Sequence, residues 1–512
     1  MKRTLLVASF ITAVVAAFAL PGGSASAGLF GGKPAPTATP SAAPAPIPTA
    51  TPEPPGIAIP RLQEKLKANP NDRDALVGLA QQYLAVGHPE LSLPLTQKLL
   101  QLGEKTAQVY YFDGSAQAAL GRVPQAIADL ESASNLEPTN IGVLSTLADL
   151  YLKTNRPKDA ERIANRAVTF NKTDPRAFTT LGIVDATEKK YDEARAQFEA
   201  AFKLDPKDVT PLLQEAQTYA NQKALSSAVA AVDRARAIDP RNVQVLVFRA
   251  DLLAQQNDIP KAAAAFDDAI AAATTDDDKV AISIRKAAMY VAAKQNAQAD
   301  QTFQAAIAAY PKVASGYTAY GEYLAGQHQT PKAQQEFLQA LQVNKDEPGA
   351  LLDMAEIKLS SHQTTDAIGY LKHLGDVAPT AQAFALLGQA YIATHNYGSA
   401  RDACSKSFQI QRAPETLGCV AGSDYSLKNY KEAAQIFDVL DANVKAYLDQ
   451  NPQLLYMAGV SYTQVNQKSK AIGAYKRLLK VMKPGTKEYK NIQASINSLS
   501  KPSPHASKKK PG

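Results

Sequence analysis

Small and bulky apolar residues recur along this chain with a period of about 34 residues. The small position is filled twelve times, by Ser92, Ala126, Ala160, Ala194, Ala228, Ala262, Ala299, Ala333, Ala367, Ala400, Ala433 and Ala471. In most units a bulky apolar residue lies 16 positions before it, as Leu144 precedes Ala160, and another lies four positions after it, as Phe198 follows Ala194. A period of this length is typical of stacked repeats, because one repeat cannot bury its own apolar face.

Each unit is predicted to hold two antiparallel helices. The first half carries apolar residues at helical spacing, for example at Leu144, Leu147, Ala148 and Tyr151. Small residues in the same half, such as Gly182, are expected to face the alanine where the two helices cross. A proline often follows twelve residues after the small residue and ends the second helix, since proline lacks the amide hydrogen. The pattern therefore predicts an all-α chain.

These columns together resemble the tetratricopeptide repeat (TPR) family from about Pro60 to Pro484. The resemblance is clearest at Phe178, Leu181, Gly182, Tyr191, Ala194, Phe198, Ala201 and Pro206. It implies a right-handed α-solenoid of about twelve helix-turn-helix repeats. Leu62 and Leu66 keep the phase of a second helix alone, which predicts a half-repeat N-terminal cap. Ile492 and Ile496 keep a helical period after the last repeat, which predicts a C-terminal capping helix.

The repeats are expected to form two blocks, residues 60–272 and 273–499, because the spacing is stretched between Ala262 and Ala299. Thr274 and Thr275, followed by the acidic residues 276–278, suit the N-cap and first turn of a helix there. The alternative is a loop insertion that the fold tolerates and that does not separate two functional blocks.

Both ends of the chain differ from the repeats. Residues 1–27 have two basic residues, an apolar run and an Ala25-Ser26-Ala27 site, which predicts a secretory signal peptide. An uncleaved membrane anchor is the alternative. Residues 28–59, rich in Pro, Ala and Thr, are expected to be a disordered linker, and residues 500–512 a basic disordered tail. These segments predict an extracytoplasmic protein, either periplasmic or secreted.

The formal net charge of +7 arises mostly in these ends. Six of the basic residues lie in the expected signal peptide and tail, at Lys2, Arg3, Lys501, Lys508, Lys509 and Lys510. The repeats lack the clustered Lys and Arg that nucleic acid requires, so no nucleic-acid partner is expected. The tail either makes weak contact with an anionic surface or only aids solubility.

Candidate catalytic and metal-binding residues are sparse. Four of the six histidines fall in the turn between the two helices of a unit, at His88, His328, His362 and His395. Neighbouring repeats place such turns about 10 Å apart, whereas zinc ligands lie within about 2.1 Å of the metal. No HExxH, GxSxG, Walker or GxGxxG motif is present. We therefore expect no catalytic residue, no metal site and no cofactor.

The resemblance places the partner-binding groove on the first helices, mainly one and five positions after the bulky residue. The candidates are Val77, Gln81, Tyr111, Ser115, Ser145, Asp149, Thr179, Ile183, Leu213, Gln217, Val247, Asp251, Ile284, Ala288, Thr318, Glu322, Leu352, Glu356, Gln389, Tyr425 and Tyr456. They are small, apolar and faintly acidic. TPR domains that hold acidic chaperone tails use Lys, Arg and Asn there, so we expect a neutral or apolar protein segment or helix instead.

The predicted function is that of a non-enzymatic extracytoplasmic scaffold for protein–protein interactions in bacterial envelope assembly, secretion or surface structure. A carbohydrate-binding or cell-wall-binding protein is the alternative, with Tyr111, Tyr425 and Tyr456 as candidate platforms. The partner and the oligomeric state stay open.

The chain has two cysteines, Cys404 and Cys419. They fall in consecutive helices and lie equally far from the turn between them, so they can face each other. An oxidising compartment would stabilise a disulfide between them, and two buried thiols are the alternative.

Overall fold

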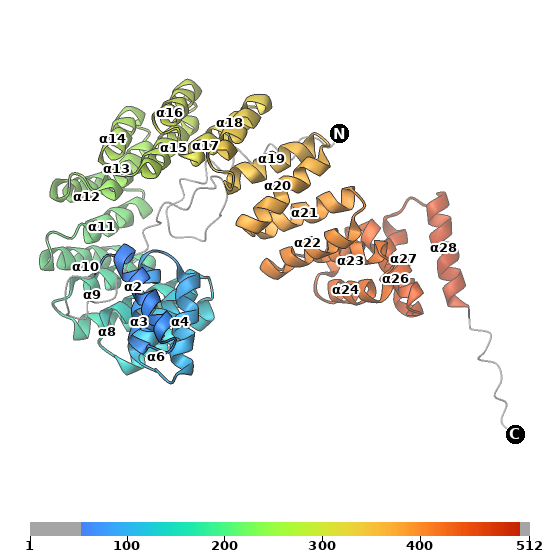
Figure 1. Ribbon diagram of the computed structural model, residues 1–512, viewed down its shortest axis with the longest axis horizontal. Helices are drawn as coiled ribbons and strands as arrows, with labels where there is room; N and C mark the ends of the chain where they lie inside the picture. The colour runs from blue at the N-terminus through green and yellow to red at the C-terminus, as the bar shows by residue number, and fades with distance from the viewer. Residues whose placement is uncertain (1–52, 502–512) are drawn as a thin grey trace. The chain divides into compact units, whose positions relative to one another are not determined.

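The computed structural model describes residues 53–501, which form 27 helices and no strand (Figure 1). The expected signal peptide, most of the expected linker and nearly all of the expected tail lie outside the described residues. Contacts divide the described chain after Asn296 into an N-terminal unit, residues 53–296, and a C-terminal unit, residues 297–501.

The N-terminal unit consists of consecutive helices that pack against one another. They are α2 (Pro55–Ala68), α3 (Arg73–Ala85), α4 (Pro89–Gln101), α5 (Ala107–Ala119), α6 (Val123–Leu136), α7 (Ile141–Lys153), α8 (Pro157–Phe170), α9 (Pro175–Thr187), α10 (Tyr191–Leu204), α11 (Thr210–Asn221), α12 (Leu225–Ile238), α13 (Val243–Gln255), α14 (Ile259–Ala272) and α15 (Asp276–Ala292).

The C-terminal unit continues the same alternation. Its helices are α16 (Asn296–Ala309), α17 (Ala314–Gly326), α18 (Thr330–Val343), α19 (Pro348–Ser360), α20 (Thr364–Val377), α21 (Ala381–Ala393), α22 (Tyr397–Ile410), α23 (Pro414–Ser426), α24 (Tyr430–Asn443), α25 (Lys445–Asp449), α26 (Pro452–Gln464), α27 (Lys468–Val481) and α28 (Lys487–Ser500).

The helix order confirms the predicted repeats. Twelve pairs run from α3–α4 to α26–α27, preceded by the single helix α2 and followed by α28. The predicted cap of α15 is also confirmed, since the Thr275 hydroxyl accepts a hydrogen bond from the Asp278 amide at 3.1 Å. The short helix α25 was not predicted; it lies between Ala433 and Ala471, where the spacing of the small column is also longer than 34 residues.

Two boundaries differ from the sequence expectation. Helix α2 begins at Pro55, inside the expected linker, because proline suits the first turn of a helix, where its missing amide hydrogen costs nothing. Helix α15 belongs to the N-terminal unit although the second block was expected to begin at residue 273. The reason is its contacts with that unit, which include a 2.6 Å ion pair from Lys286 to Asp267 of α14. A functional division at this point stays a prediction.

The turn inside each pair has one repeated geometry. After α7, the Asn155 amide donates to the Leu152 carbonyl at 3.0 Å, and the Arg156 amide donates to the Tyr151 carbonyl at 2.8 Å. This is the Schellman arrangement, which requires a left-handed residue after the helix. That residue is Gly87, Gly121, Asn155, Lys189, Lys223, Asn257, Lys294, His328, His362, His395, Lys428 or Asn466 in the twelve pairs. Three of the four predicted turn histidines therefore hold this position, and His88 follows Gly87.

Within each unit, the small column lies at the buried crossing point of a helix pair. Ala160, Ala194 and Ala333 are completely buried. The glycine of the first helix lies closest to the side chain four positions after the alanine, and Gly114 also faces the alanine, since its added Cβ would lie 3.0 Å from the Ala126 carbonyl oxygen. A Cβ atom on Gly182 would lie 2.5 Å from Phe198 Cε1, so the ring occupies the space that the glycine leaves.

No helix among residues 53–501 is both long and apolar enough to cross a bilayer.

Candidate partner-binding surface

Most first helices contact the first helix of a neighbouring repeat in the same unit. In the N-terminal unit α3, α5, α7, α9 and α11 make such contacts in succession, and in the C-terminal unit α17 contacts α19, α21 contacts α23, and α23 contacts α26. Successive second helices contact one another less. In a stack of helix pairs, the helices that approach more closely line the inner side of the curve. The predicted binding residues lie on these first helices.

The predicted residues differ in accessibility. Tyr111, Leu213, Ile284, Thr318 and Glu322 are buried. Glu356, Gln389 and Tyr456 are exposed. Those of intermediate exposure are Val77, Gln81, Ser115, Ser145, Asp149, Thr179, Ile183, Gln217, Val247, Asp251, Ala288, Leu352 and Tyr425.

Some of these side chains join neighbouring first helices. The Ser145 hydroxyl of α7 and the Thr180 hydroxyl of α9 are hydrogen-bonded at 2.8 Å. Burial raises the pKa of Tyr111, and a side-chain hydrogen bond with Thr146 of α7 partly opposes that shift. Tyr111 is only 8% exposed and packs on Phe112 with ring centroids 5.8 Å apart. It therefore offers no free ring face to a sugar.

A charged pair joins α13 and α15. The Arg285 guanidinium donates from Nε and Nη2 to the two carboxylate oxygens of Asp251, at 3.1 and 2.6 Å. Burial raises the pKa of Asp251, and the positive charge of Arg285 opposes this shift.

Four carboxylates gather where α17 meets α19, and we call this set the acidic junction: Glu322, Glu347, Asp353 and Glu356. Burial raises the pKa of Glu322 well above its ordinary value, and the negative charges of Asp353 and Glu347 raise it further. Burial also raises the pKa of Asp353 to about 7, and Glu356 adds to that shift. Sequence analysis selected Glu322 and Glu356 but missed the other two, although Asp353 lies only two residues after the bulky Leu351.

A second acidic pair lies between α5 and α6. Asp113 is 2% exposed and accepts a hydrogen bond from the Thr96 hydroxyl. Gln117 Nε2 donates to Asp129 at 2.7 Å. Burial and the adjacent Asp113 raise the pKa of Asp129 to about 7. These contacts are internal to the packed helices, which indicates a structural role.

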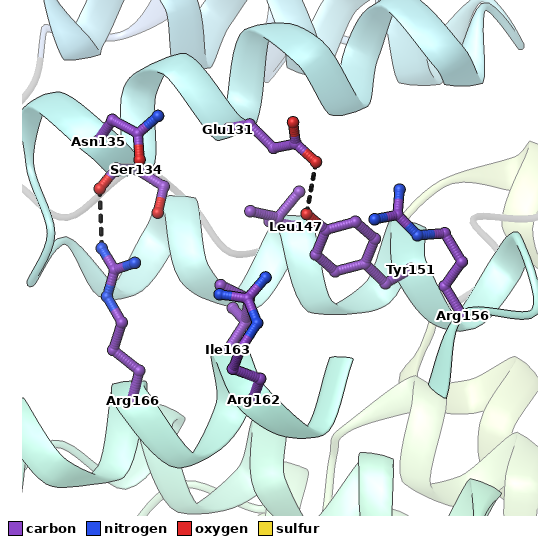
Figure 2. Close-up of a pocket in the computed structure, with 9 residues that line it drawn as sticks. All are labelled: Glu131, Ser134, Asn135, Leu147, Tyr151, Arg156, Arg162, Ile163 and Arg166. Atoms are coloured by element: carbon purple, nitrogen blue, oxygen red, sulfur yellow. Dashed lines mark hydrogen bonds between the residues drawn. The ribbon is translucent and has the colours of Figure 1, made fainter. Parts of the chain in front are cut away.

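A half-open pocket of about 250 Å³ lies over α6, α7 and α8 (Figure 2) and was not predicted. Arg166 donates to the Ser134 and Pro138 carbonyls at 2.8 and 2.9 Å, which satisfies the C-terminal end of α6. Arg156 lies 4.3 Å from the ring centroid of Tyr151, whose hydroxyl donates to Glu131 at 2.6 Å. Because these groups are already engaged within the chain, the pocket is a structural junction.

An exposed apolar row at the ends of second helices was also missed. Its members in the N-terminal unit are the last residues of α6, α8 and α10, namely Leu136, Phe170 and Leu204. Those in the C-terminal unit are the last residues of α18, α20, α22 and α27, namely Val343, Val377, Ile410 and Val481. They are between 38% and 58% exposed. Each of these residues lies ten positions after a small-column residue. This regular spacing is the sequence signal that could have revealed the row.

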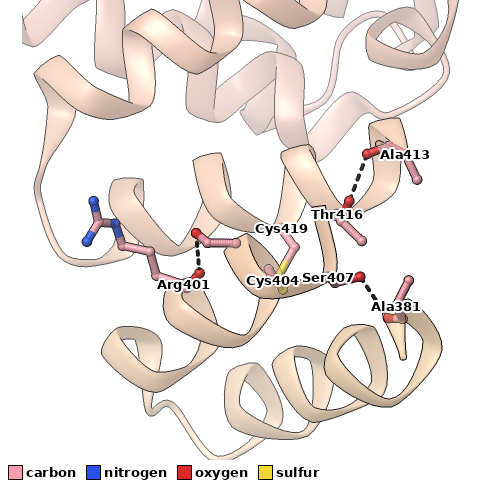
Figure 3. Close-up of a disulfide and its surroundings, with 8 residues drawn as sticks. Ala381, Arg401, Cys404, Ser407, Ala413, Thr416 and Cys419 are labelled. Atoms are coloured by element: carbon pink, nitrogen blue, oxygen red, sulfur yellow. Dashed lines mark hydrogen bonds between the residues drawn. A yellow bond between two sulfur atoms is a disulfide. The ribbon is translucent and has the colours of Figure 1, made fainter. Parts of the chain in front are cut away.

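Cys404 of α22 and Cys419 of α23 are joined by a disulfide (Figure 3), with Cα atoms 6.1 Å apart. An ion pair between Arg401 of α22 and Asp424 of α23, at 2.8 Å, also joins these two helices. The Ser407 hydroxyl of α22 donates instead to the Ala381 carbonyl of the preceding helix α21, at 2.7 Å. The two cysteines are therefore bonded to each other, and the alternative of two buried free thiols does not hold.

Between Glu53 and Lys501, no group of three or more His, Cys, Asp or Glu side chains is arranged to hold a metal ion.

Comparison with known proteins identifies the repeats. Residues 117–182 and 186–252 match the sequence profile described as tetratricopeptide repeat. The TPR repeat-containing thioredoxin TDX of Arabidopsis thaliana is 31% identical over 103 residues, which are 20% of this chain and 27% of that protein.

Two solved structures are similar. One is YrrB, titled a TPR protein with an unusual peptide-binding site, at 26% identity over 36% of this chain and 95% of its own, with a TM-score of 0.28. The other is yeast Tom70, at 16% identity over 73% of this chain and 92% of its own, with a TM-score of 0.38.

Proposed function

Because the chain is a tetratricopeptide repeat protein, we propose that it is a non-enzymatic scaffold that binds segments of other proteins along its first helices. Proteins of this family bind other proteins or peptides. The observation that carries the proposal is the direct contact between successive first helices from α3 to α11, from α17 to α19 and from α21 to α26, which brings their half-exposed residues together on shared surfaces.

The composition of this surface suits a protein segment. Leu352, Gln389 and Tyr456 offer both apolar area and hydrogen-bonding groups. Protein interfaces combine these two properties, with aromatic residues enriched at the centre.

We also propose that the protein works outside the cytoplasm, in bacterial envelope assembly, secretion or surface structure. The pattern of residues 1–27 supports export. The Cys404–Cys419 disulfide supports an oxidising compartment, where such bonds persist. Sequencing the N-terminus of the protein from fractionated cells tests this, because a mature chain beginning after Ala27 is expected in the extracytoplasmic fraction. Recovery of the unprocessed chain in the cytoplasm would contradict the location.

Affinity capture from an envelope extract tests the binding surface. The immobilised full chain should retain protein partners, and Gln389→Arg combined with Tyr456→Ala should lose them, because both residues are exposed on first helices. A matched control places Val377→Gln and Ile410→Gln in the exposed apolar row of the same unit, and it should retain the partners.

If only the control variant lost the partners, the binding site would lie on the second helices instead. Retention of isolated wall polymer, with no protein captured, would favour the carbohydrate-binding alternative.

A further inference from the structure

Asp251 and Glu322 occupy the same position in their repeats, five residues after the bulky position at Leu246 and Tyr317. Asp251 is paired with Arg285 of the next first helix. Arg285 lies two residues after Ser283, which fills the bulky column in that repeat. This pair shows how the fold neutralises a mostly buried acid on a first helix. The side chain of Asp251 is only 15% exposed.

At the acidic junction the equivalent of Arg285 is Asp353, two residues after Leu351. Glu322 therefore faces another acid instead of a base. Glu322 is only 8% exposed, and its Oε2 atom and the Oδ2 atom of Asp353 are buried without a hydrogen-bond partner. Within residues 53–501, neither of these two acids nor Glu356 forms an ion pair. An unpaired buried carboxylate is costly, so Glu322 and Asp353 lack the positive group that Asp251 has.

The electrostatics agree with this geometry. Burial and the neighbouring negative charges of Asp353 and Glu347 raise the pKa of Glu322, and no positive charge opposes the shift. A cation placed here would lower these pKa values again and release bound protons.

The kind of positive group that could neutralise these acids is already present beside Asp251, where it is the guanidinium of Arg285. A guanidinium presents five N–H donors in a planar fork that fits carboxylates, and long basic side chains reach buried acids while their stems lie along apolar surface. Glu356 is exposed, so the junction opens onto the first-helix surface where a partner segment would lie.

We propose that the acidic junction between α17 and α19 binds a lysine or arginine side chain of a partner protein, in the place that Arg285 takes beside Asp251. This inference rests on the proposed function, and it names the chemistry of the segment that the surface takes. It replaces the expectation of a wholly neutral or apolar segment with one that carries a single basic anchor.

Selection of a phage-displayed library of random 12-residue peptides on the full chain tests the proposal. We expect the enriched peptides to share one Arg or Lys. Replacing an anchor Arg by citrulline, its neutral analogue, should weaken binding by at least about tenfold in fluorescence anisotropy, since a buried charge-assisted pair is lost. Glu322→Gln, which keeps the shape and removes the charge, should weaken it similarly.

Two further variants test whether a loss of binding comes from the acidic junction itself or from any change of an acidic residue. Asp353→Arg should abolish binding and raise the thermal midpoint, because the new guanidinium fills the junction from within. Glu336→Gln, a half-buried glutamate on the second helix α18, should leave the affinity unchanged. Circular dichroism checks that each variant is folded.

The outcomes distinguish this inference from the proposed function. Peptides that bind without a basic residue, and bind Glu322→Gln equally well, would overturn the inference and leave the scaffold function standing. A library that yields no binder at all would count against both. Binding that appears only after residues 502–512 are deleted would assign the junction to the chain's own basic tail and overturn a role for a partner.

Discussion

The contact between Gly182 and Phe198 allows a quantitative test of the packing between the two helices of a repeat. In Gly182→Ala the new Cβ atom would lie 2.5 Å from Phe198 Cε1 and 2.8 Å from Cδ1, far inside normal contact distance. The ring is 1% exposed, so it has no free space into which it can move. The same substitution also replaces glycine by alanine in the interior of a helix. Without a clash, this exchange stabilises the helix, because alanine has the higher helix propensity.

The magnitudes follow from these two opposing effects. Overpacking costs about 3 kcal/mol at the upper end of its usual range, and alanine is favoured over glycine in a helix by about 1 kcal/mol. Gly182→Ala should therefore lower the free energy of unfolding by about 2 kcal/mol. In a Phe198→Ala background the clash is absent, so the same change should stabilise by about 1 kcal/mol. The coupling free energy is then about 3 kcal/mol.

Hydrogen exchange of the amides in α9 and α10 measures this coupling, because repeat arrays need not unfold in two states. Gly369→Ala in α20 is the matched control, since no atom lies within 4 Å of its added Cβ. The control should stabilise its helix by about 0.5 to 1 kcal/mol. If Gly182→Ala had the same effect with and without the Phe198 ring, the proposed role of that contact would be refuted.

Three further predictions concern a covalent bond, a proton and a turn. Reduction of the Cys404–Cys419 disulfide, which closes a sequence separation of 15, should lower stability by about 3 kcal/mol, and unchanged urea midpoints with dithiothreitol would contradict this. Because the pKa of Asp129 is about 7 in the fold and near 4 when unfolded, its contribution is most favourable below about pH 4 and is lost as the pH rises toward 7. Asp129→Asn should therefore show a smaller fall in thermal midpoint between pH 4.5 and 7.5, and an unchanged fall would refute the shift. Lys189→Gly should raise stability by about 0.5 to 1 kcal/mol, because Lys189 has a φ of 64°, and a lower urea midpoint would contradict it.

The regular part of the fold could be predicted because the small and bulky columns report the crossing of two helices. A residue that must be small every 34 positions, such as Ala194, marks that crossing wherever it occurs. The start of α2 at Pro55 could not be predicted in this way, because its prolines resemble the linker in composition. The short helix α25 lies in an insertion, where the period gives no information.

The candidate surface could be predicted as a set of positions but not as a set of interactions. The register identified Asp251 and Glu322 as equivalent residues on first helices. Whether each is neutralised depends on the next first helix, which supplies Arg285 in one case and Asp353 in the other. The two cysteines were expected to face each other, yet the sequence left open whether they are bonded.

The disulfide joins the second helix of one repeat to the first helix of the next, so it spans a repeat boundary. In a linear array, each repeat is stabilised mainly by its nearest neighbours, and unfolding can propagate stepwise from an end. A covalent link across one boundary makes the two adjoining repeats open as one cooperative block. Fraying that starts at α28 therefore has to unfold both repeats together at this point, which makes the bond a barrier to unzipping and to proteolysis from the C-terminal side.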